Sequence, residues 1–184
     1  MAHDKYLQEW RTRREIPNPQ IKDAADQYEQ ARQILAEQPP GAGVLLPLVN
    51  NAAMAIELYL KCLAGETIHV PESDERQSCV VYAKANTGGH QFTTILCTID
   101  EDICRQMESI YVKATHRQLK HDLSTIEGAL VVSRYPYEPD MDISRVSLQT
   151  LMSIAKFLRR FVASLEPRET IQWSDGSIST VEYL

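Results

Sequence analysis

The sequence predicts an all-α protein, an up-and-down bundle of five or six helices with small β-hairpins. Apolar residues recur about every 3.6 residues over long stretches, most clearly across residues 44–64. Proline and glycine clusters separate these stretches. At two places in the chain, a polar turn lies between two short β-prone runs. A chain of 184 residues with 43% hydrophobic residues suits one globular domain with its own core.

The first two helices have the clearest boundaries. Asn18 followed by Pro19 is a typical helix start, and the breaker at residues 39–41 ends that helix. The second helix covers residues 44–64 and stops at Gly65. Its broad apolar stripe is typical of a helix at the centre of a bundle. On its polar side Glu57 and Lys61 lie four residues apart in the order that favours an ion pair.

Two segments favour hairpins instead of helices. Residues 67–70 and 78–82 are β-prone and flank a polar loop, which predicts a hairpin between the second and third helices. Near the end of the chain, Asp175 and Gly176 form a turn dipeptide between two further β-prone runs. That tail either folds back as a hairpin or exchanges with a partner chain.

Four further helices are expected after the first hairpin. One opens at Gly88 and Gly89, the next begins at residues 100–102, a third covers residues 122–132, and a long one runs over residues 144–165. The chain then divides into an arm or short helix (residues 1–17), a helical domain (residues 18–166) and a tail (residues 167–184) with the second hairpin.

Charge and composition exclude several classes. The net charge of −6 argues against indiscriminate binding to nucleic-acid backbones. No apolar segment approaches the roughly 20 residues that span a bilayer. The N-terminus has no apolar leader, so we expect a cytoplasmic protein without membrane contact. The four cysteines form no C-x-x-C pair and are expected to be reduced.

Four motifs occur in an order that resembles the HEPN domain superfamily. The second helix contains an A-x-E-x-x-x-K run that includes Glu57 and Lys61. His90 follows two glycines at a helix start, and Arg134, Tyr135 and Pro136 precede the final long helix. The resemblance covers residues 18–165. It implies a helical bundle that forms a homodimer through its final helices.

The resemblance also implies two classes of function. Many such domains are metal-independent ribonucleases that use an R-x4–6-H motif, and others bind RNA or nucleotides or accompany nucleotidyltransferases. Here the residue six positions after Arg134 is Asp140, which cannot replace histidine as a proton shuttle near neutral pH. Arg117 and His121 form R-x3-H and would share a face if they lay on one continuous helix.

The ligand-binding candidates are an arginine, two tyrosines and three residues near the centre of the bundle. Arg134, Tyr135 and Tyr137 could stack on a base and contact a phosphate, or the tyrosines could fill the gap between two helices. Glu57, Lys61 and His90 are expected near the same cleft; the alternative roles are a structural ion pair and a helix start. His116, His121 and Asp122 have poor spacing for a metal site, so neither metal nor cofactor is predicted.

The preferred interpretation is a non-catalytic homodimeric binding module for RNA, a nucleotide or a protein partner such as a nucleotidyltransferase or an antitoxin. One alternative is a metal-independent endoribonuclease of the toxin or phage-defence type, with Arg134, Arg117, His121 and Asp140 as its candidate catalytic residues. Another is a structural interaction dimer that docks through its C-terminal hairpin. The binding interpretation requires residues 44–64 and 144–165 to pack together beside the Arg134 turn.

Overall fold

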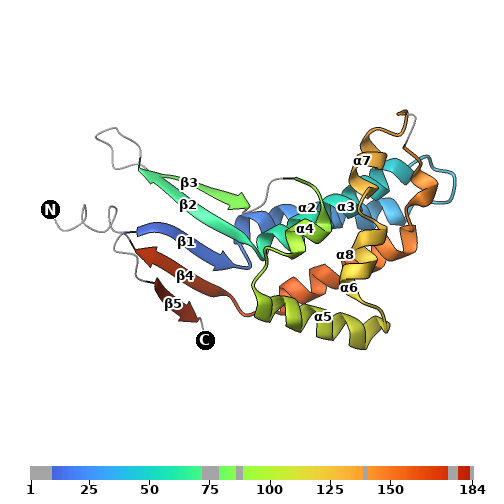
Figure 1. Cartoon of the computed structure of the whole chain (residues 1–184). Helices are drawn as coiled ribbons and strands as arrows, with labels where there is room; N and C mark the ends of the chain where they lie inside the picture. Colours follow the sequence, from blue (N-terminus) through green and yellow to red (C-terminus); the bar gives the residue numbers. More distant parts are fainter. Residues whose placement is uncertain (1–9, 72–78, 86–88, 139–140, 174–177, 183–184) are drawn as a thin grey trace.

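The computed structural model describes residues 10–71, 79–85, 89–138, 141–173 and 178–182. A helical body forms one part of the molecule and a twisted β-sheet extends from one end of it (Figure 1). The predicted fold class, a helical bundle with small β-hairpins, is confirmed. Within the described residues, no helix combines the length and the apolarity needed to cross a membrane.

Three long helices form the centre of the body. They are α2 (Pro19–Ala36), α3 (Leu45–Cys62) and α8 (Leu148–Ser164), and each contacts the other two. The middle of α3 is buried on nearly all sides because its apolar stripe is broad enough to face several neighbours. The predicted packing of the second helix against the last long helix is therefore confirmed.

Shorter helices close the body around α3. They are α4 (Phe92–Leu96), α5 (Glu101–Thr115), α6 (Leu119–Thr125), α7 (Ala129–Arg134) and the 3-10 turn η1 (Ile143–Arg145). The single helix predicted over residues 122–132 is wrong, because α6 ends at Thr125 and α7 begins at Ala129. Gly128, at the N-cap of α7, lies between them; a glycine inside a helix costs about 1 kcal/mol relative to alanine.

The sheet joins the two predicted hairpins into one structure. β2 (Gly65–Pro71) pairs with β3 (Cys79–Ala85), and β4 (Arg168–Trp173) pairs with β5 (Ile178–Glu182), all antiparallel. β1 (Trp10–Ile16) lies between the hairpins and gives the order β3-β2-β1-β4-β5.

Residues 10–16, where the sequence predicts an arm or a short helix, therefore form the central strand. Each hairpin alone would leave an edge of unpaired backbone groups, and β1 pairs antiparallel with β2 on one side and β4 on the other. Arg14 of this strand contacts the helical body, because its NH1 lies 3.0 Å from Asp100 Oδ1.

Asn18 holds the junction between the sheet and the bundle. Its side-chain oxygen accepts a hydrogen bond from the amide of Ile21 at 3.2 Å, so the predicted helix cap is confirmed. The fully buried Asn18 also donates its backbone N–H to Cys62 O at 2.7 Å and its Nδ2 to Thr67 Oγ1 at 3.1 Å. One residue, through its backbone and its side chain, thus connects α2 to the end of α3 and to β2.

Gly65 lies where α3 turns into β2, and we expect Gly65→Ala to destabilise the protein. An added Cβ would lie 2.7 Å from Ile21 Cδ1 and 3.1 Å from the carbonyl oxygen of Lys61. The expected loss is about 1–3 kcal/mol in the free energy of unfolding, measured by urea denaturation. Gly128→Ala is the matched control, since its nearest neighbour is Val132 Cγ2 at 3.9 Å. Equal effects of the two substitutions would contradict this account of Gly65.

Candidate functional site

The structure brings Glu57, Lys61 and His90 into direct contact. Glu57 is almost fully buried on α3, and its Oε1 accepts a hydrogen bond from Lys61 Nζ at 2.6 Å. Nδ1 of His90 lies 2.9 Å from Glu57 Oε2, whereas the rest of the imidazole is largely exposed. A buried carboxylate needs such partners, since an unpaired charge in the interior is costly. These residues form a cluster that connects α3 to the segment before α4.

Arg134 lies at the end of α7 and reaches the same face of α3. Its Nε donates to Asn50 Oδ1 at 3.3 Å, and its NH2 lies 3.1 Å from Met54 Sδ. Met54 is three residues before Glu57, and residues with that spacing are neighbours on a helix surface. Neither contact partner carries a charge, and the Arg134 side chain is exposed to solvent.

Tyr135 and Tyr137 follow Arg134 and are exposed to solvent. Tyr135 is 44% exposed and Tyr137 is 78% exposed. Their rings form an edge-to-face pair with centroids 6.4 Å apart. The alternative in which both tyrosines fill a gap between helices is therefore wrong. We refer to Glu57, Lys61, His90, Arg134, Tyr135 and Tyr137 together with Asn50 and Met54 as the α3–α7 surface.

The pair Arg117 and His121 does not lie on a continuous helix. α5 ends at Thr115, because His116 adopts the left-handed conformation with φ 57°, and α6 begins only at Leu119. Arg117 NH2 donates to Oδ1 of the buried Asp122 at 2.7 Å, so its charge is already paired. The condition for a shared helix face, one continuous helix over both residues, is therefore not met. Asp140, the other candidate of the ribonuclease interpretation, lies outside the described residues.

No group of three histidine, cysteine, aspartate or glutamate side chains in the described part of the chain could hold a metal ion.

Asp122 also accepts a hydrogen bond on its second oxygen, from Tyr111 OH at 2.5 Å. Burial and this hydrogen bond raise the pKa of Tyr111 well above its usual range. Asp122 is therefore the centre of a buried hydrogen-bond network with Tyr111 and Arg117.

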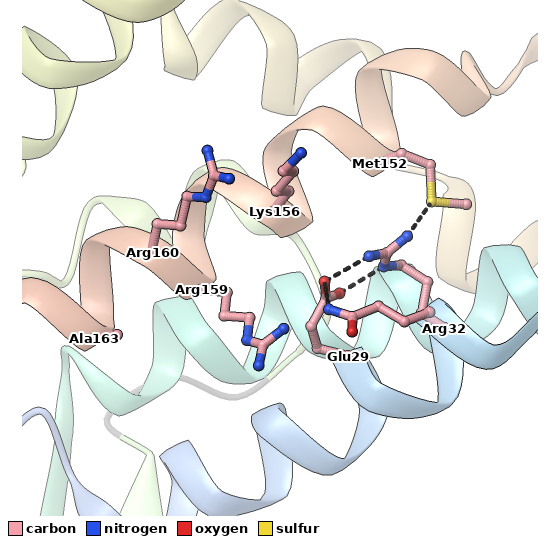
Figure 2. A pocket seen from close by; sticks show the side chains of 8 residues that line it. Glu29, Arg32, Met152, Lys156, Arg159, Arg160 and Ala163 are labelled. Atoms are coloured by element: carbon pink, nitrogen blue, oxygen red, sulfur yellow. Dashed lines mark hydrogen bonds and ion pairs between the residues drawn. The ribbon is translucent and has the colours of Figure 1, made fainter. Parts of the chain in front are cut away.

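A basic groove between α2 and α8 is a second candidate site, which the sequence did not predict. Its volume is about 530 Å³, and four cationic side chains line it against a single carboxylate (Figure 2). The lining residues are Glu29, Arg32, Gln33, Met152, Lys156, Arg159, Arg160 and Ala163. The two helices are far apart in the sequence, so no local motif signals the groove.

Arg32, the cation on the α2 side of this groove, is already paired with a carboxylate. Glu29 is fully buried and binds Arg32 through both of its oxygens, at 2.6 Å each. Figure 2 shows Arg159 pointing across the groove toward Glu29.

Arg159 also influences Asp26 on α2. Burial acts to raise the pKa of Asp26, but hydrogen bonds from Lys22 and Tyr59 and the charges of Lys22 and Arg159 outweigh it. The pKa of Asp26 is therefore lowered, and the carboxylate stays ionised opposite these cations. Arg32 and Arg159 thus contribute to the structure of the α2–α8 packing.

Comparison with protein-family models, with curated protein sequences and with solved structures found no match to this chain. The resemblance to HEPN domains therefore stays a prediction from the four motifs.

Proposed function

We propose that this protein is a non-catalytic module that binds single-stranded RNA through the α3–α7 surface. The observation that carries the proposal is the exposure of Tyr135 and Tyr137 beside the guanidinium of Arg134. Unpaired bases stack on exposed aromatic rings, and arginine contacts the adjacent phosphates. In a fully paired duplex the bases are already stacked on one another, so they cannot stack on the two tyrosine rings.

The cluster of Glu57, Lys61 and His90 extends this surface along α3. The largely exposed imidazole of His90 can donate or accept a hydrogen bond at a base edge, while Glu57 fixes its position. Lys61 balances the charge of Glu57. In this proposal the cluster orients the ligand and carries out no proton transfer to it.

The proposed absence of catalysis rests on the arginines of the ribonuclease interpretation. Arg134 has no histidine at the family spacing, and Arg117 is paired with Asp122. A homodimer, as the resemblance implies, would present two α3–α7 surfaces to one RNA strand. Two linked sites would then raise the overall affinity without new contacts.

The test is a fluorescence-anisotropy titration with a labelled single-stranded RNA of about 12 nucleotides, in EDTA. We expect Tyr137→Ala to weaken binding by about 1–3 kcal/mol, the usual contribution of one stacked base. Tyr137→Phe keeps the ring and should bind almost as tightly as the original protein. A duplex of the same length should bind more weakly than the single strand.

Two results would contradict the proposal. One is an affinity that Tyr137→Ala leaves unchanged. The other is cleavage of the RNA in EDTA that disappears in Arg134→Ala, which would favour the endoribonuclease interpretation. Gel analysis of the RNA recovered from the titration detects such cleavage directly.

A further inference from the structure

A second groove lies on the other side of α8, between this helix and α5. Its volume is about 490 Å³. Apolar side chains contribute much of its lining, with Ile110 and Ala114 from α5 and Phe157 and Phe161 from α8. Ile110 is 40% exposed, so its apolar side chain is accessible in the groove. A groove of this size and composition is typical of small-molecule sites.

Lys156 and Arg160 line this groove and also the basic groove between α2 and α8. They therefore lie on the outer face of α8, between the two grooves. Figure 2 shows both side chains pointing to the same side of α8, away from Glu29 and Arg32. Among the described residues, no carboxylate forms an ion pair with either of them, in contrast to Arg32.

Lys156 and Arg160 lie on the exposed side of α8, where an amphipathic helix usually carries its charged residues. Residues four apart on a helix have Cβ atoms about 6 Å apart, and two like charges there destabilise the helix by a few tenths of a kcal/mol. Both side chains also border an apolar groove that gains nothing from their charge. An anion placed between Lys156 and Arg160 would remove the repulsion, and an apolar group attached to it would cover Ile110 and Phe157.

We propose that the α5–α8 groove binds a small organic phosphate, a molecule in which an aromatic or other apolar body carries a phosphate group. The phosphate lies between Lys156 and Arg160, and the apolar body lies against Ile110 and the partly exposed Phe157. Ser153 also lines the groove, and its hydroxyl gives polar groups on the body a hydrogen-bond partner. This site shares no residue with the α3–α7 surface, so it does not depend on the proposed RNA binding.

The test is isothermal titration calorimetry of the full chain with three probes: 1-naphthyl phosphate, adenosine 5′-monophosphate and inorganic phosphate. At least one organic phosphate should bind about tenfold or more tightly than inorganic phosphate, because only the organic probes cover the apolar lining. Preference for the adenosine probe identifies a nucleotide as the ligand, and preference for the naphthyl probe identifies another aryl phosphate. Equal affinity for all three probes would overturn the proposal.

Variants locate the site on the molecule. Lys156→Gln and Arg160→Gln should each lower the affinity for the organic probe about threefold, and the double variant should lower it about tenfold. Ile110→Asp should abolish binding, since it places a negative charge against the phosphate and removes apolar contact. Arg105→Gln on α5 makes the same change of charge outside the groove and should leave the affinity unchanged.

All of these positions are exposed, so the variants are expected to fold, and circular dichroism checks this. Binding that survives the double variant and Ile110→Asp in folded protein would contradict the assignment of the site.

Discussion

Replacing Glu29 by glutamine is expected to lower the free energy of unfolding by about 3 kcal/mol, because it leaves a buried arginine without its counter-charge. The Glu29 carboxylate is fully buried and binds the guanidinium of Arg32 through two bonds of 2.6 Å each. Gln33 Nε2 donates a third hydrogen bond to the same carboxylate at 3.2 Å. Glutamine preserves the shape but removes the charge, and Arg159 already adds positive charge to this groove.

Urea denaturation of Glu29→Gln measures this loss, and Glu101→Gln is the matched control. Glu101 also pairs with an arginine on its own helix, but its side chain is 86% exposed and lies 3.7 Å from Arg105. Such surface pairs contribute at most about 1 kcal/mol. If both substitutions cost less than about 1 kcal/mol, water in the groove hydrates Arg32 and the ion pair is not a structural requirement.

Replacing Asp122 by asparagine is expected to lower the free energy of unfolding by about 2 kcal/mol, less than for Glu29 because the Arg117 side chain is half exposed and water can hydrate it. Asp122 is fully buried and accepts hydrogen bonds from Tyr111 OH and from Arg117 NH2. Arg117 also donates to Thr150 Oγ1 of α8 at 3.3 Å, so the network connects α5, α6 and α8. An asparagine can accept only one of the two hydrogen bonds well and leaves the guanidinium without a counter-charge.

A double-mutant cycle with Tyr111→Phe tests whether these residues act as one network. Tyr111→Phe alone should cost about 1–2 kcal/mol, and the two substitutions together should cost less than the sum of their separate effects. Asp23→Asn on the exposed side of α2 is the control and should change stability by less than about 0.5 kcal/mol. Strict additivity in the cycle would show that Tyr111 and Asp122 contribute independently.

Periodicity in the sequence predicts the helical part of this fold well. α3 and α8 each carry a regular apolar stripe, and proline or glycine marks the boundaries of α2 and α3. Both hairpins were also predicted, because their turns and β-prone runs are local signals. The sequence does not predict the break between α6 and α7, since the single residue Gly128 gives only a weak signal.

The central strand β1 could not be predicted from its own residues. Trp10–Ile16 is rich in charge and lacks a clear apolar alternation. Its conformation depends on two hairpins that begin 55 and 158 residues after its first residue, at Gly65 and Arg168. Strand formation is strongly context-dependent, and here the context consists of both neighbouring edges.

The candidate site shows the same division between local and long-range information. Glu57 and Lys61 were predicted as a pair from their spacing, and the order of the motifs placed His90 and Arg134 near them. Arg117 and His121 do not share a helix, because Arg117 lies in the turn between the end of α5 at Thr115 and the start of α6 at Leu119. The basic groove depends on the packing of α2 against α8, which spacing along the chain does not reveal.

The most direct test of the proposed function is an NMR titration of the ¹⁵N-labelled protein with a single-stranded RNA of about 12 nucleotides. The account predicts that the largest amide shifts occur at residues 134, 135 and 137 and at His90, while the amide of Ala163 beside the basic groove changes little. Shifts concentrated on α2 and α8 with residues 134–137 unaffected, or no shifts at RNA concentrations well above that of the protein, would contradict it.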